Sequence, residues 1–500
     1  MVTFIVALIL LVVGFFTYGV LVEKIFGIEP ERKTPALTKT DGVDFVPMSS
    51  WRIFLVQFLN IAGLGPIFGA IMGVCFGPAA FLWIVFGTIF AGGVHDYLSG
   101  MLSIRKGGAS LPEIVGDELG SGVKYFMRVL SIVLLILLTT TFLTGPANLL
   151  QGLAALPTIG AGAGTRPIVW VLIIFGYYAL ATVLPVDKLI GRFYPIFGAM
   201  LLFMGLGIMV IMLGWHSSDM PEMFGEYGLS NRLGSDYPLF PMMFVSIACG
   251  AISGFHGTQS PIMARCCTSE RQGRWIFYGA MVAEGILALI WAAAAGTFFA
   301  NGGDGIANLQ TFLNEHHNNP ASVIDIVSRD WLGTIGGILA IIGVIAAPIT
   351  SGDTALRSAR LIVADFLHLD QRPVPKRLVI ALPLFACVFG MVFIDFGVVW
   401  RYFAWTNQTL ACFTLWAGTV WLYKNGQRDK VQSTKYRYGY LIALVPAVFM
   451  TMVCCCYILI APEGMHIPAQ WRWLGYLIAG MAALCCLCGF MFWAKKNHKS

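Results

Sequence analysis

The chain has 500 residues, of which 57% are hydrophobic and only 12% are charged, and its formal net charge is +6. A water-soluble domain needs more charged surface than this composition supplies. The composition therefore excludes a soluble globular protein and indicates a protein that lies within a lipid bilayer.

Thirteen apolar stretches are long enough to cross a bilayer as helices. In chain order they are residues 2–21, 51–73, 78–98, 123–145, 167–185, 191–213, 239–256, 275–299, 332–350, 377–394, 398–423, 439–460 and 471–493. They are continuous apolar runs rather than short alternating strands, which favours helices over a transmembrane barrel. The sequence thus predicts an all-α polytopic membrane protein. Because the first stretch has no basic segment and no cleavage site, we expect it to be retained.

The basic residues predict the topology. Nearly all of the 32 Lys and Arg residues fall in one set of alternate loops, which we assign to the cytoplasm. The opposite set holds only Arg166, Arg232, Arg329, Arg401 and Arg472. We therefore expect a multi-pass protein of the bacterial inner membrane with its N-terminus outside and its C-terminus in the cytoplasm. The net charge then reflects orientation in the membrane and does not indicate nucleic-acid binding.

Two of the thirteen stretches are interrupted by Gly, Pro and polar residues. The second contains Gly63, Gly65 and Pro66, and the seventh ends in a polar, glycine-rich run over residues 253–257. In hydrocarbon, unwound backbone is tolerated only where protein or a water-filled cavity satisfies it. Broken helices at matching places in two halves indicate the binding site of a transporter.

The two interruptions lie five stretches apart and in helices of opposite direction, which favours an inverted five-helix repeat. The predicted division is a peripheral first helix with its loop (1–50), a first repeat (51–235), a second repeat (236–425), and two peripheral helices with a tail (426–500). The alternative is a pair of Pro/Gly kinks without symmetry.

Ionisable side chains inside membrane helices are costly and are candidates for function. Asp96 (beside His95), Glu284, Asp353 and His256 fall at membrane depth, and residues 405–409 add a polar run that includes Asn407 and Gln408. The alternative for each is a structural bond between helices, and for Asp353 a pair with Arg357 four residues on. The twelve cysteines mostly fall in apolar stretches, so we expect small buried hydrophobes rather than disulfides or a metal site.

Five short motifs together resemble the carbon starvation protein A family. They are Asn60-Ile-Ala-Gly-Leu-Gly-Pro66, Gly107-Gly-Ala-Ser-Leu111, Cys249-Gly-Ala-Ile-Ser-Gly-Phe-His256, Pro348-Ile-Thr-Ser-Gly-Asp-Thr354 and Trp400-Arg-Tyr-Phe-Ala-Trp-Thr-Asn-Gln408. That family is similar to the amino acid–polyamine–organocation superfamily, whose LeuT-type fold is a five-plus-five inverted repeat. The resemblance implies cation-coupled uptake of pyruvate or of peptides by alternating access.

The resemblance also implies two sets of site residues. Substrate would be held at the helix breaks by Asn60, Gly63, Gly65, Ser253, Gly254, His256, Asn407 and Gln408. A coupling Na⁺ would lie at Thr350 and Ser351, whereas proton coupling would use Asp96, Glu284, His256 or Asp353. We expect no cofactor beyond the coupling ion. The alternative function is a membrane-embedded enzyme or sensor, although the sequence contains no Ser-His-Asp spacing, HExxH motif or P-loop.

Overall fold

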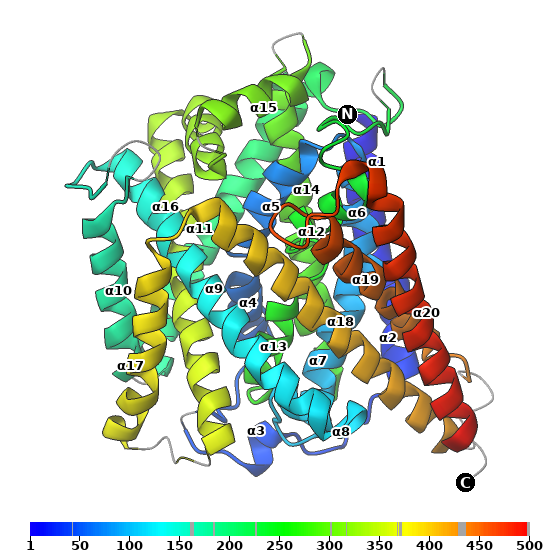
Figure 1. The fold of residues 1–500 in the computed structure, drawn as a ribbon. Helices are drawn as coiled ribbons and strands as arrows, with labels where there is room; N and C mark the ends of the chain where they lie inside the picture. The colour runs from blue at the N-terminus through cyan, green and yellow to red at the C-terminus, as the bar shows by residue number, and fades with distance from the viewer. Residues whose placement is uncertain are drawn as a thin grey trace.

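The computed structural model describes residues 1–497 except 43, 161–164, 184–185, 226–227, 301–302, 317, 368, 370–372 and 429–436. The described residues form helices and loops, with a single isolated β-bridge between Ile159 and Arg166. The all-helical prediction is confirmed for this part of the chain. Figure 1 shows the helices running mostly along one direction, as in a membrane bundle.

The first half of the chain runs from α1 to α11. Its helices are α1 Val2–Phe16, α2 Tyr18–Phe26, α3 Pro35–Thr38, α4 Ser50–Ile61, α5 Leu64–Val74, α6 Ala79–Phe86, α7 Gly93–Arg105, α8 Leu111–Leu119, α9 Ser121–Leu153, α10 Ile168–Val183 and α11 Val186–Trp215. A π-helical segment, Gly87–Gly92, joins α6 to α7.

The second half runs from α12 to α20. Its helices are α12 Leu239–Ser246, α13 Gly254–Ala264, α14 Gly279–Phe298, α15 Gly305–Glu315, α16 Pro320–Leu367, α17 Val374–Met391, α18 Phe396–Arg428, α19 Leu441–Ile460 and α20 Arg472–Asn497. A second π-helical segment, Arg274–Tyr278, leads into α14. The predicted stretch 332–350 is part of the much longer α16, which bends at Gly333, where φ is +68°.

Nine helical segments of the described chain are long and apolar enough to cross a membrane, or ten when the bent pair α4–α5 is taken as one span. The other three predicted stretches are also helical: 167–185 corresponds to α10, 239–256 to α12 and α13, and 398–423 to α18. Taken singly, these helices are too short or too polar to be counted among the helical segments that can cross a membrane. The chain is thus a multi-pass membrane protein, and the count of thirteen spans stays a prediction.

Both predicted helix breaks exist, but each lies earlier in the chain than expected. The helix axis turns by 47° between α4 and α5 at Ala62–Gly63, and Gly65 and Pro66 already belong to the first turn of α5. The second break covers residues 247–253, and Gly254–Gly257 form the first turn of α13. Gly250 supplies the left-handed backbone that this break needs, with φ of +90°. In both broken spans, the glycine and proline residues of the sequence mark the start of the half-helix that follows the break. They do not mark the unwound residues themselves.

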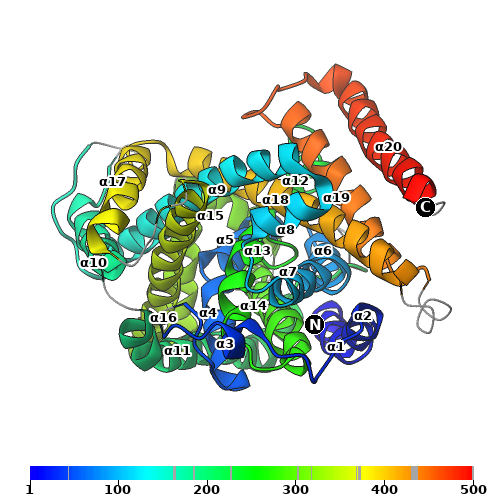
Figure 2. The same ribbon diagram turned by 90° about the horizontal axis from the view of Figure 1, so that it is seen from below.

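The broken helices lie in the middle of the bundle. In Figure 2, α4, α5, α13 and α14 occupy the centre, α1, α2, α19 and α20 lie on one side, and α10 and α17 lie on the opposite side. The second half of each broken helix packs on a continuous one: α5 on α14, and α13 on α7. Nearly every residue of α5 and α13 is buried. Their polar side chains are therefore enclosed by protein.

Candidate functional site

Three central helices bring four ionisable side chains together. His95 and Asp96 lie in the first turn of α7, directly after the π-helical segment. His256 lies in the first turn of α13, directly after the second break, and Glu284 lies on α14. π-Helical turns shift the register of a helix and are frequent at functional sites. Such a turn precedes both carboxylates here.

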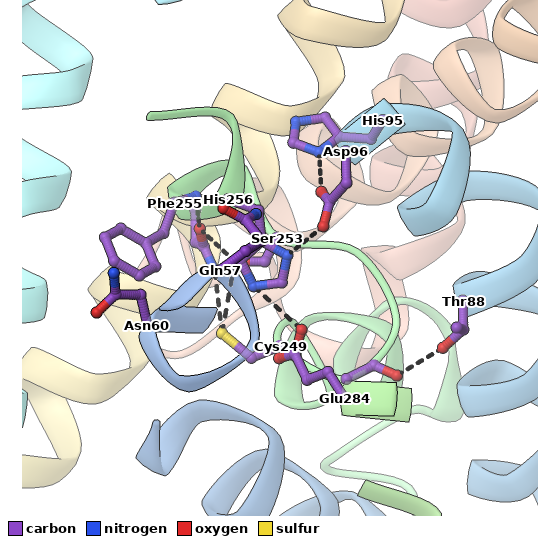
Figure 3. A network of polar contacts seen from close by, with 12 residues as sticks. Gln57, Asn60, Thr88, His95, Asp96, Cys249, Ser253, Phe255, His256 and Glu284 are labelled. Carbon is purple, nitrogen blue, oxygen red and sulfur yellow. Dashed lines mark hydrogen bonds and ion pairs between the residues drawn. The ribbon is translucent and has the colours of Figure 1, made fainter. Parts of the chain in front are cut away.

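The four side chains form a continuous chain of polar contacts (Figure 3). His95 Nδ1 lies 2.7 Å from Asp96 Oδ1, and Asp96 Oδ2 lies 2.9 Å from Nδ1 of His256. The other ring nitrogen of His256, Nε2, lies 3.2 Å from Glu284 Oε2. All four side chains are fully buried. We call this set the buried relay.

The position of His256 between two carboxylates limits its protonation state. A neutral imidazole has one N–H and can donate to only one of them. Facing both Asp96 and Glu284, the ring either carries two protons or meets one carboxyl group that is itself protonated. Either arrangement places a proton at a buried, bridging position. A buried ionic cluster of this kind is costly unless every charge is matched.

Asn407 and Gln408 of α18 satisfy backbone groups that the second break leaves free. Asn407 Oδ1 accepts a hydrogen bond from the Phe255 N–H at 2.7 Å, and its Nδ2 donates to Cys249 Sγ at 3.4 Å. Gln408 Nε2 donates to the carbonyl of Phe244 near the end of α12. On the opposite side of the break, Thr88 donates to the Gly250 carbonyl at 2.9 Å. These bonds meet the requirement that unwound backbone inside a membrane be paired.

The glycines predicted to bind substrate pack tightly against other helices in this structure. A Cβ added to Gly65 would lie 2.5 Å from Cys249 Sγ, and one added to Gly63 would lie 2.9 Å from the ring of Phe142. At Gly254 it would lie 2.2 Å from the carbonyl oxygen of Asn407. Each glycine therefore permits a close approach between helices. Their role toward a substrate stays a prediction.

The predicted sodium-site residues lie on α16 beside the first break. Ser351 Oγ donates to the Asn60 carbonyl at 2.8 Å, so α16 does contact the last turn of α4. Thr350 Oγ1 donates to Ala347 within its own helix at 2.7 Å. Asp353 is buried, with its Oδ2 4.0 Å from Nη2 of Arg357, the pairing that the sequence offered as its structural alternative. Among these residues only Ser351 bonds to the broken helix.

Sequence reasoning overlooked two features of the site. Cys249 was classed with the small hydrophobes, although its Sγ lies beside His256 and Glu284, with the three donor atoms within 4.8 Å of one another. Gln57 donates to Ser260 at 3.1 Å and links α4 to α13. The place of Cys249 in the motif that ends at His256 was the available signal.

A polar cavity of about 290 Å³ opens elsewhere in the bundle, at the end where α9 finishes. Its lining includes Thr140, Thr144, Asn148, Arg166 and Asp395. None of the predicted site residues lines this cavity. The predicted residues are instead enclosed between helices.

Comparison with known proteins places the chain in a family. The model of the family described as carbon starvation protein CstA matches residues 1–165 and 161–328. A Haemophilus influenzae protein described as an uncharacterized membrane protein is 45% identical over 332 residues, covering 58% of this chain and 89% of that one.

Relatives with assigned functions are more distant. The peptide transporter CstA of Campylobacter jejuni is 29% identical over 58% of this chain and 49% of its own length. The pyruvate/proton symporter BtsT of Escherichia coli is 26% identical over 56% of this chain and 47% of its own length. The chain thus spans about half the length of these two transporters.

A solved structure shares the fold. The Eremococcus coleocola manganese transporter superposes with a TM-score of 0.56 over 92% of this chain and 98% of that one, at 13% sequence identity. The identity is low enough that the likeness concerns the fold alone. Because the family model covers more than half of the chain, this protein belongs to the carbon starvation protein CstA family.

Proposed function

We propose that the chain is a proton-coupled symporter that imports a small carboxylate such as pyruvate, or short peptides, by alternating access. The observation that carries this proposal is the buried relay, in which His256 bridges Asp96 and Glu284 beside a helix break. Intramembrane ionisable residues that pair with one another mark proton relays in transporters. The names of the CstA and BtsT relatives support transport of the same substrate classes.

The packing of the helices supports a LeuT-type core with repeats 51–235 and 236–425. Exchanging the two repeats would exchange α5 with α13 and α7 with α14, and the two contacts α5–α14 and α13–α7 both occur. The same exchange relates the contacts α11–α4 and α18–α12, and the contacts α10–α9 and α17–α16. Two unrelated kinks would not predict such matched pairs. The core would comprise ten of thirteen spans, as in the amino acid–polyamine–organocation superfamily.

The coupling step would use the relay as follows. In the present arrangement Asp96, His256 and Glu284 are all buried, and His256 would hold the proton between the two carboxylates. When a half-helix moves, the distance from His256 to Asp96 or Glu284 changes, and the proton gains an exit to one side. Because His256 lies on the half-helix α13 and Glu284 lies on the continuous α14, movement at the break separates them directly.

The substrate carboxylate would be met by backbone rather than by a basic side chain. The sequence from Ile53 to Ile104 contains no Lys or Arg. The helix α5 starts at Leu64, and its N-cap residue Gly63 provides no side-chain cap, whereas the Phe255 N–H of α13 is taken by Asn407. Helix N-termini favour anions through their free N–H groups and dipole. The start of α5 is therefore the better anion partner of the two breaks.

Uptake by purified protein in liposomes tests the proposal. Labelled pyruvate and labelled dipeptides would be supplied under an imposed proton gradient or an imposed sodium gradient. We expect accumulation under the proton gradient alone, and loss of accumulation in His256→Gln. The control is Asp117→Asn, an exposed carboxylate on α8 that pairs with Lys106. Accumulation under the sodium gradient alone would overturn proton coupling, and no uptake of either substrate would favour the enzyme or sensor alternative.

A further inference from the structure

A thiol, an imidazole and a carboxylate converge at the second helix break. Cys249 lies in the unwound residues 247–253, His256 lies on α13, and Glu284 lies on α14. Their donor atoms lie within 4.8 Å of one another, and all three residues are buried. Figure 3 shows the Cys249 sulfur and the Glu284 carboxylate on the same side of the His256 ring. The sequence-based expectation that the cysteines serve only as small hydrophobes does not account for this arrangement.

We propose that Cys249, His256 and Glu284 form a binding site for a divalent transition metal of the Zn²⁺ class, with the fourth coordination position open. This set of sulfur, nitrogen and oxygen donors suits Zn²⁺ and Co²⁺ and does not suit Mg²⁺ or Ca²⁺, which take oxygen ligands. Three protein ligands with one open position are typical of Zn²⁺ sites that bind a further small ligand. One thiolate and one carboxylate together balance the charge of the ion.

The surroundings of the three donors support the assignment independently. Asp96 Oδ2 lies 2.9 Å from His256 Nδ1, which leaves Nε2 directed toward Glu284 and Cys249. A carboxylate behind the distal ring nitrogen is the usual support of a metal-ligating histidine. Asn407 Nδ2 lies 3.4 Å from Cys249 Sγ and can stabilise a thiolate.

The buried donors also have unused bonding capacity. Within the described part of the chain, neither oxygen of Glu284 nor Nε2 of His256 has a well-aligned hydrogen bond, although the two side chains face each other as an ion pair. Buried polar atoms without hydrogen bonds are rare in proteins and call for an explanation. A metal ion would take Nε2 of His256 and one oxygen of Glu284 as ligands.

The break gives the site the freedom to contract around an ion. Zn–S bonds of about 2.3 Å and Zn–N bonds of about 2.0 Å place neighbouring ligands of a tetrahedral ion roughly 3.3–3.7 Å apart. The largest present separation, up to 4.8 Å, must therefore shorten by about 1 Å. Cys249 is in non-helical backbone next to Gly250, so its sulfur can move without bending a helix.

Metal binding has a defined proton balance. The Cys249 thiol releases its proton to water to become a thiolate, and the proton that the proposed symport places between His256 Nε2 and Glu284 is released with it. The metal ion is then bound by His256 and Glu284, the same side chains that hold the proton in the proposed symport. A bound ion therefore blocks proton-driven uptake and competes with protons for the site. This consequence rests on the proposed function, whereas the binding site itself does not.

Co²⁺ titration of purified full-length protein tests the site. The exposed Cys387, Cys485, Cys486 and Cys488 are first replaced by Ser, because exposed thiols could bind Co²⁺ by themselves. In this parent we expect one Co²⁺ per chain, with tetrahedral visible bands and a near-ultraviolet thiolate-to-Co²⁺ charge-transfer band. Cys249→Ser removes the charge-transfer band, and Asp96→Asn weakens binding about 10–100-fold. Cys267→Ser, a buried cysteine away from the site, is the matched control and keeps the band.

Two further measurements distinguish failure of the metal site from failure of the proposed symport. Zn²⁺ raises the thermal unfolding temperature of the parent and of Cys267→Ser, but not that of Cys249→Ser, whose folding is checked by size-exclusion chromatography. The same preparations are assayed for pyruvate uptake in the presence of a metal chelator. Absence of the band in the parent, or its survival in Cys249→Ser, overturns the metal site whatever the uptake. Metal binding without uptake under either gradient overturns the symport alone.

Discussion

At the scale of single residues, the contacts of His256 and Thr350 underlie the proposal of proton coupling rather than sodium coupling, two modes that the sequence left open. His256 contacts both Asp96 and Glu284, whereas the hydroxyl of Thr350 bonds within its own helix. Ser351 does reach the Asn60 carbonyl, but as a hydrogen-bond donor. A sodium ion there would need that hydroxyl to turn its oxygen toward the ion. The relay requires no such change to hold a proton.

Asp96→Asn tests this distinction. The amide keeps the shape of the side chain but loses the negative charge that faces His256, so the relay holds its proton less tightly. We expect concentrative uptake under a proton gradient to fall about tenfold or more, equivalent to about 1.4 kcal/mol, while exchange of substrate across the membrane without a gradient persists. The measurement compares labelled-substrate uptake and exchange in the same liposomes.

The companion variant is Ser351→Ala. It removes the hydroxyl nearest to the first break, and we expect it to leave the dependence of uptake on sodium and on protons unchanged. A rise in the sodium concentration needed for half-maximal uptake in Ser351→Ala, together with normal proton-driven uptake in Asp96→Asn, would contradict proton coupling through the relay.

At the scale of elements, the two half-helices α5 and α13 meet through a glycine and a cysteine. Gly65 lies in the first turn of α5, and it is so close to the Cys249 side chain that an added Cβ would lie 2.5–2.6 Å from the Sγ and Cβ atoms of that cysteine. From the sequence, Gly65 is predicted to be among the residues that hold substrate, where glycine would let the substrate approach the backbone closely. The structure supplies a second reason, which is close approach of the two broken spans. Substitutions at Gly65 and Cys249 distinguish these two reasons for glycine.

Gly65→Ala should impair both stability and uptake, because the added methyl group collides with Cys249. Overpacking of a buried contact costs about 1–3 kcal/mol. Adding Cys249→Gly removes the colliding atoms, so the double variant should recover the thermal unfolding temperature of Cys249→Gly alone. If Gly65→Ala is as stable as the parent yet inactive, and Cys249→Gly does not restore uptake, clearance for the substrate is the better explanation. The measurements are thermal unfolding and liposome uptake of all four proteins.

At the scale of the whole molecule, the start of α1 and the end of α20 lie at opposite ends of the bundle in Figure 1. An odd number of membrane crossings has this consequence, and thirteen is the number that the apolar stretches predict. The distribution of basic residues predicts that the end with the C-terminus of α20 faces the cytoplasm. The helix α15 lies at the end opposite to the termination of α20, on the face predicted to be external.

Reporter fusions test this arrangement. A fusion at Gly426 should report a cytoplasmic location, as should one at Lys499, which lies outside the described residues, and a fusion at Asn318 should report an external one. Each site is fused in turn to an enzyme that is active only in the periplasm and to an enzyme that is active only in the cytoplasm. Either location of the site then gives a positive signal with one of the two fusions. A cytoplasmic location for Asn318, or an external one for Gly426, would contradict the thirteen-span topology.

The sequence by itself determined the helical class, the positions of the apolar helices and the existence of two broken spans. These properties depend on local composition: a bilayer admits helices of fixed length, and glycine with proline interrupts them. The same local signal misplaced the breaks, because Gly65 and Gly254 mark the starts of new half-helices. Asp96, His256 and Glu284 were recognised individually because ionisable groups are rare in hydrocarbon.

Only the tertiary structure decided which of these groups meet. Asp96 and His256 are 160 residues apart, and their contact depends on the packing of α13 against α7. The placement of α14 beside the second break brings Glu284 to Cys249 and His256, whereas the Asp353–Arg357 pair lies within α16 and was already offered by the sequence. Sequence spacing reports distances along one helix, and a contact between helices depends on their crossing and rotation. A buried thiol therefore reads as a hydrophobe in the sequence and becomes a candidate ligand once its neighbours are known.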